Sequence, residues 1–151
     1  MRISVFVCRK GCDVMLHQDY LMRMFLQLAS ALRESLEKAR GGSDPEAAAE
    51  RLDEALENAT EFDGALLLTM APESMAAMVR LSDPDPLLME YVARSLLLSS
   101  RCLADAGLGE RSSLREGQAH ALAREFGFSL DDADLEPDEL ESFFERTLPT
   151  T

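Results

Sequence analysis

The stretch from Pro86 to Ala106, PLLMEYVARSLLLSSRCLADA, constrains the fold of this chain more than any other part of its sequence. At helical spacing, apolar and small side chains cover most of its circumference. These residues are Leu87, Leu88, Met89, Tyr91, Val92, Ala93, Ser95, Leu96, Leu97, Leu98, Ser99, Cys102, Leu103 and Ala106. A helix that is apolar on most sides is normally buried at the centre of a protein. Arg94 and Arg101 bound its uncharged segment too closely for a membrane span, so we expect a buried central helix.

The amino-acid composition favours one helical domain. A chain of 151 residues can bury roughly two-thirds of the surface that its unfolded form exposes. With 46% hydrophobic and 28% charged residues, the composition is that of a globular protein rather than a disordered one. Alanine, leucine, glutamate, arginine and methionine dominate, and these residues have high helix propensity.

The net charge of −13 limits the classes of partner that we expect. It arises from 28 acidic and 15 basic residues. Nucleic-acid backbones and anionic membranes would be repelled by such a chain, so we expect neither as a partner. A basic protein or peptide is electrostatically permitted, although a plain acidic surface would account for the same charge.

The cysteine content favours a reducing compartment. Cys8, Cys12 and Cys102 are odd in number and do not form a disulfide framework, which indicates a cytoplasmic protein. The apolar run from Ile3 to Cys8 is too short for the centre of a signal peptide.

Apolar residues at spacings of three and four, with helix start and stop signals, predict the remaining elements. The expected helices cover residues 18–40, 44–62, 72–81, 86–106 and 110–126, with a last one that begins at Pro137. Asp85 should cap the central helix and Gly107 should end it, with Leu108 making the apolar contact that commonly follows such a glycine. Counting a short helical bridge, we expect an all-α fold of five to seven helices.

The helix expected at 110–126 has two alternative starts and one unusual glycine. Ser113 and Glu116 have the spacing of a capping box, but the helix could also begin as early as Glu110. The residues expected to face inward are Leu114, Gly117, Ala121 and Phe126. A glycine costs about 1 kcal/mol relative to alanine inside a helix, so we expect a neighbouring helix to approach Gly117 closely.

Residues 1–14 differ from the helical part of the chain, and two interpretations of them stay open. In the first, Met15 is the natural first residue and the preceding residues are an extension. In the second, residues 1–14 form an arm that packs on the helices or on a neighbouring subunit. Residues 15–151 are expected to form a single helical domain in either case.

The acidic C-terminal segment, residues 128–151, is expected to end in a capping helix. Phe143 and Phe144 lie on one side of this helix together with Leu140. Two roles stay open for the phenylalanines: they close the open end of the helical stack, or they dock on a second subunit.

Two segments of the chain, 18–62 and 86–126, share one layout. Each has a long helix, a glycine-containing turn and a shorter helix rich in small residues. This layout resembles the tetratricopeptide-type helical hairpin, in which alanine and glycine let two helices lie close together. The full tetratricopeptide signature is absent, so we expect hairpins that are tetratricopeptide-like.

A second resemblance covers most of residues 15–126. It is carried by QDYLMRM at 18–24, by LLLTMAPE at 66–73 and by the turn at 103–109. These features are similar to those of a family of small bacterial proteins of unknown function with a tetratricopeptide-like fold. The resemblance implies a bacterial protein, and it implies no catalytic or binding residues.

Two residue clusters could hold a metal, and for both a simpler explanation is favoured. Cys8, Cys12 and His17 have a spacing that zinc could use, but a fourth ligand would have to be His120 from a distant helix. The acidic residues Asp131, Asp132, Asp134, Glu136, Asp138 and Glu139 look like a calcium loop. Pro137 stands where such a loop needs glycine, so a solvated acidic linker is favoured and no metal or cofactor is expected.

The sequence contains no recognisable catalytic constellation, because neither histidine can be placed beside a serine or cysteine nucleophile. We therefore expect a non-enzymatic protein–protein interaction module, whose partner is a protein, a peptide or a second copy of the chain. The alternative is a small-molecule sensor or helical enzyme with an apolar pocket beside Met75, Met78 and Tyr91. A methionine-rich recognition surface is a further hypothesis, although methionine at helical spacing is more often core.

Overall fold

The computed structural model describes residues 10–41, 44–59 and 63–148, with side chains described from Asp19 onward. Seven α-helices and one 3₁₀ helix lie in these residues, and no strand does, which confirms the all-α class. Their bounds are α2 Lys10–Gly41, α3 Pro45–Asn58, α4 Gly64–Leu67, α5 Pro72–Leu81, α6 Pro86–Asp105, α7 Gly109–Phe126, η1 Asp132–Leu135 and α8 Pro137–Thr147.

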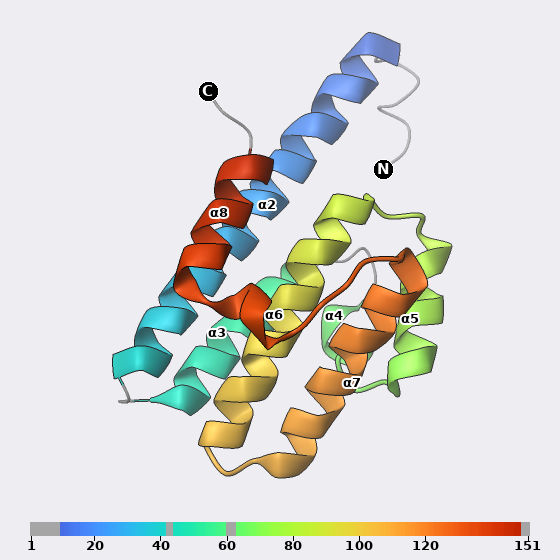
Figure 1. Cartoon of the computed structure of the whole chain (residues 1–151). Coiled ribbons are helices and arrows are strands. Elements are labelled where there is room, and N and C mark those ends of the chain that lie inside the picture. The colour runs from blue at the N-terminus through green and yellow to red at the C-terminus, as the bar shows by residue number, and fades with distance from the viewer. Residues whose placement is uncertain (1–9, 42–43, 60–62, 149–151) are drawn as a thin grey trace.

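Helix α6 is the central element, as its apolar circumference predicts. It packs against α2, α3 and α7 (Figure 1), and every residue from Tyr91 to Ser100 is buried. The carboxylate of Asp85 accepts hydrogen bonds from the amides of Leu87 and Leu88 at the start of the helix. At its end Gly107 has a φ of +81°, a conformation that favours glycine. Both predicted ends of this helix are therefore confirmed.

Two antiparallel helix pairs, α2 with α3 and α6 with α7, make up most of the fold (Figure 1). The α2–α3 pair is joined by a buried hydrogen bond, in which the hydroxyl of Ser35 donates to the carbonyl of Ala48 at 2.9 Å. The α6–α7 pair is joined by Ser100 and Ser112, whose hydroxyls each donate to the other's carbonyl at 2.8 Å. The helical hairpins are thus present, and their tetratricopeptide-like stacking stays a prediction.

Helix α8 closes one side of the bundle through its aromatic side chains. Phe143 and Phe144 are buried against Tyr91 of α6, whose ring also contacts Phe25 of α2. The hydroxyl of Tyr91 lies 2.6 Å from Oγ1 of Thr147 at the end of α8. Of the two roles that the sequence left open, the phenylalanines take the capping role within their own chain.

Helix α2 begins at Lys10, eight residues before the predicted start at residue 18. Its first turns pass through Gly11 and extend beyond the other helices (Figure 1). Because nucleation is the costly step and each further residue adds a hydrogen bond, a long helix can extend through one glycine. Phe62, the last residue of the helix expected at 44–62, lies outside the described residues.

The inward face of α7 differs from the prediction. The helix begins at Gly109, so Ser113 and Glu116 lie inside it and form no capping box. The buried residues are Arg115, Gln118, Ala119, Ala121, Leu122 and Ala123, whereas Leu114, Gly117 and Phe126 are only half-buried. Ala121 is buried as predicted and Phe126 packs against the core, but apolar spacing missed Arg115 and Gln118, whose polar side chains are buried against polar partners. The close approach at Gly117 is confirmed, since a Cβ there would lie 2.8 Å from Cγ of Pro72.

The acidic segment at 131–139 is largely exposed, as a solvated linker would be, and two of its carboxylates also pair with arginines of α6. Asp132 lies 2.7 Å from the guanidinium of Arg101, and Asp134 lies 3.7 Å from that of Arg94. Asp131 and Asp134 form a capping box around η1. Asp131, Asp132 and Asp134 therefore have structural partners within the fold.

Candidate functional site

A pocket of about 360 Å³ lies between α2, α4, α5 and the start of α6. Its volume lies in the range of pockets that hold small molecules or buried side chains of a partner. It is lined by Tyr20, Leu21, Leu56, Ala59, Gly64, Leu67, Leu68, Met75, Val79, Ser82, Asp83, Pro84, Asp85, Pro86, Leu88, Met89, Val92 and Leu122.

The inner wall of this pocket is apolar. Met75 and Val79 project from α5, Leu88 and Met89 come from α6, and Leu122 comes from α7. All five are buried. The inner wall therefore favours the binding of apolar groups, because a polar group placed there would lose its hydrogen bonds to water.

The polar lining residues gather at the α5–α6 connection and on α2. Ser82 and Asp83 follow α5, Asp85 precedes α6, and Tyr20 is 37% exposed on α2. The hydroxyl of Ser82 donates to the carbonyl of Val79 at 2.8 Å. These groups make a polar mouth above an apolar interior.

Asp83 has a left-handed backbone, with a φ of +50°. Its amide donates to the carbonyl of Arg80 and so ends α5, in the position that glycine usually occupies after a helix. A residue other than glycine is strained in this region, although aspartate and asparagine tolerate it better than most. Asp83 is exposed and lines the mouth of the pocket.

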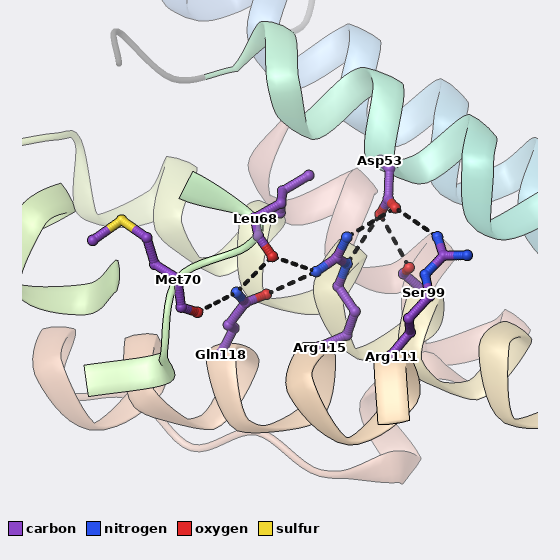
Figure 2. A network of polar contacts seen from close by, with 7 residues as sticks. All are labelled: Asp53, Leu68, Met70, Ser99, Arg111, Arg115 and Gln118. Carbon is purple, nitrogen blue, oxygen red and sulfur yellow. Dashed lines mark hydrogen bonds and ion pairs between the residues drawn. The ribbon is translucent and has the colours of Figure 1, made fainter. Parts of the chain in front are cut away.

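A network of largely buried polar groups joins α3, α6 and α7 to the segment between α4 and α5 (Figure 2). The guanidinium of Arg115 pairs with both carboxylate oxygens of Asp53, at 3.2 and 3.0 Å, and also donates to the carbonyl of Leu68 at 2.7 Å. The amide nitrogen of Gln118 donates to the carbonyls of Leu68 and Met70, at 3.0 and 2.9 Å.

Two further side chains complete the carboxylate's surroundings in this network. The hydroxyl of Ser99 donates to Asp53 at 3.2 Å, and the guanidinium of Arg111 lies 3.9 Å from it. The Asp53 side chain is only 13% exposed and that of Arg115 9%. A buried pair of this kind needs such additional hydrogen bonds to offset the loss of hydration.

The network positions one wall of the pocket. It holds the carbonyls of the α4–α5 connection, and the Leu68 side chain of that connection lines the pocket. On α4, Gly64 lies so close to α3 that a Cβ would overlap the backbone of Glu57. Both features point to support of the pocket rather than to chemistry, because the polar groups are paired with one another.

The candidate residues from the sequence are not brought together as a site. The side chains of Cys8, Cys12 and His17 lie outside the described ones, and His120 is half-buried on α7. Within the range that was described, no group of three or more histidine, cysteine or acidic residues could hold a metal ion. The methionines divide, since Met24 and Met75 are buried whereas Met22 is exposed.

Of the residues expected beside an apolar pocket, only Met75 lines the one observed. Met78 is half-buried elsewhere on α5, and Tyr91 belongs to the aromatic cluster under α8. The sequence analysis also missed Arg115, Gln118 and Asp83. The Asp-Pro-Asp-Pro motif at 83–86 was the available signal for the pocket mouth, but the sequence analysis assigned a role only to its Asp85, as the cap of the central helix.

No protein-family model, curated protein or solved structure matches this chain. Among the described residues, no helix is both long enough and apolar enough to span a membrane. The interpretation of the site therefore depends on its own geometry.

Proposed function

We propose that this protein is a non-enzymatic interaction module that binds an apolar segment of a protein or peptide partner. The observation that carries the proposal is the pocket of about 360 Å³, with its apolar interior and polar mouth. Pockets with this division of chemistry bind by burying apolar groups and orient them through a few polar contacts. The exposed side chains of Met22 and Leu26 on α2 add apolar surface close to Tyr20 in sequence.

The one cysteine whose side chain is described supports a binding role. Cys102 is buried in α6, and its burial raises the pKa of the thiol to about 11. Because the thiolate is the reactive form, this cysteine is held inert at neutral pH. The proposal further includes a cytoplasmic location, the tetratricopeptide-like stacking and the relationship to the bacterial family described above.

A second candidate function is the binding of a small apolar molecule in the same pocket. The pocket volume favours this candidate, because it falls within the range that accommodates small ligands. Native mass spectrometry of protein purified under gentle conditions from its own host separates the two candidates. A retained small mass that disappears on filling the pocket would favour the small molecule.

A variant in which a larger side chain fills the pocket tests the proposed interaction module. Val79→Trp places a large side chain in the cavity, and Leu81→Trp adds the same side chain on the same helix at a residue that is 78% exposed and does not line the pocket. We expect proteins cross-linked to the wild type in its own cell to be lost with Val79→Trp and retained with Leu81→Trp. If a folded Val79→Trp protein retains the same partners, the pocket is not the binding site.

A further inference from the structure

The mouth of the pocket carries negative charge without a described positive group among its lining residues. Asp83 and Asp85 are the two charged residues there, and Tyr20 and Ser82 are neutral. Asp85 uses its Oδ1 oxygen to cap α6, whereas the Asp83 carboxylate is exposed. Helix α5 ends and helix α6 begins at the same mouth, so the partial charges of the two helix ends oppose each other there and the exposed Asp83 carboxylate supplies the negative charge of the mouth.

From this arrangement we propose that the pocket selects an apolar peptide segment flanked by lysine or arginine, and that Asp83 is the residue that determines this specificity. The inference rests on the proposed function, because it names the partner chemistry of the same pocket. Apolar side chains fill the interior beside Met75 and Leu122, and a flanking cation lies at the mouth beside Asp83.

Charge complementarity supports this occupant over others. The net charge of the chain is −13, so a basic segment is attracted at long range as well as at the mouth. A fatty acid or an acidic peptide would place its own carboxylate beside Asp83 and be repelled. The exposed ring of Tyr20 offers the flanking cation a second favourable contact.

Three peptides with one apolar centre test the charge preference: acetyl-KKLFLLKK-amide, acetyl-QQLFLLQQ-amide and acetyl-EELFLLEE-amide. Binding to the full chain is measured by titration calorimetry at low and at physiological salt. We expect the lysine peptide to bind about tenfold more tightly than the glutamine peptide at low salt, with the glutamate peptide weakest. The preference should shrink as salt rises, because the mouth is open to solvent.

Asp83→Asn isolates the specificity residue, since asparagine also tolerates the left-handed backbone. Its matched control is Asp138→Asn, which removes an equal charge from an exposed position on α8. We expect Asp83→Asn to reduce the lysine-over-glutamate preference by about fivefold, and Asp138→Asn to leave it unchanged.

The outcomes separate this inference from the proposed function. If the three peptides bind the wild type equally and Val79→Trp weakens all of them, the pocket binds apolar segments but the charge inference is wrong. Equal loss of the lysine preference in Asp83→Asn and Asp138→Asn would likewise overturn the role of Asp83. If no peptide binds, or if Val79→Trp changes nothing, the proposed function and the inference both fail.

Discussion

Removal of either partner of the Asp53–Arg115 pair should destabilise the fold, and removal of both should restore most of the loss. Asp53→Leu leaves the Nε and Nη2 groups of Arg115 without acceptors in a side chain that is 9% exposed. Leaving an uncompensated buried charge typically costs about 3–5 kcal/mol. Arg115→Met should cost less, about 2–3 kcal/mol, because Asp53 keeps the Ser99 hydroxyl and the neighbouring Arg111.

In the double variant, Asp53→Leu with Arg115→Met, neither charge remains. The Leu68 carbonyl keeps its hydrogen bond from Gln118, so no backbone acceptor of this network is orphaned. Replacing a whole buried ion pair by apolar side chains of similar volume is often nearly neutral, and we expect a cost of about 1–2 kcal/mol. The single costs sum to about 5–8 kcal/mol, so the coupling between the two sites should be at least about 3 kcal/mol.

Urea unfolding followed by far-ultraviolet circular dichroism measures the three free energies of unfolding. The denaturant dependence of each free energy should match that of the wild type, which would show that the surface exposed on unfolding is unchanged. Additivity of the two single costs to within about 0.5 kcal/mol would refute the pair as a coupled support of the pocket. So would a larger cost for Arg115→Met than for Asp53→Leu, because the argument assigns the greater penalty to the stranded guanidinium.

Three further predictions concern other parts of the fold. Gly64→Ala should lower the free energy of unfolding by about 1–3 kcal/mol, because the added Cβ overlaps the backbone of α3. Gly109→Ala should not destabilise the protein, because a Cβ there meets no atom within 4 Å, and urea unfolding compares the two variants. Cys102 should resist alkylation at neutral pH until the protein unfolds, as checked by mass spectrometry of the labelled peptides, because burial raises its thiol pKa to about 11. The hydrogen bond from Arg33 lowers the pKa of Glu141 in the folded protein. Above about pH 4.3 the wild type should therefore be more stable than Glu141→Gln, by less than about 1 kcal/mol, and this advantage should disappear as the pH falls through the lower pKa of the folded state. A stability difference that persists in stronger acid would contradict this.

Local signals in the sequence predicted the helices well. Asp85 and Gly107 act within a few residues of themselves, through a side-chain cap and a left-handed turn, so their effects could be derived without the rest of the fold. The apolar circumference of residues 86–106 likewise requires burial wherever the helix lies. The start of α2 was less predictable, because continuation of a helix past Gly11 depends on a small balance of propensity and hydrogen bonding.

The candidate site was largely hidden from the sequence. Arg115 and Gln118 looked like the solvent-facing side of a helix, and they are buried only because Asp53 and the carbonyls of Leu68 and Met70 meet them. Those partners come from segments some 50 to 60 residues away. The spacing of residues within one helix does not indicate such partners. Whether a polar side chain can be buried depends on hydrogen-bonding groups that lie elsewhere in the chain.

The all-α class and the buried central helix could both be derived from the amino-acid sequence, since they follow from helix propensity and from the distribution of apolar residues along the chain. The tertiary structure alone decided that Phe143 and Phe144 pack on Tyr91 in the same chain, and that a pocket remains between α2, α5 and α6. A cavity is the volume that side chains from several helices leave unfilled. It therefore depends on distances between helices, which a linear pattern does not contain.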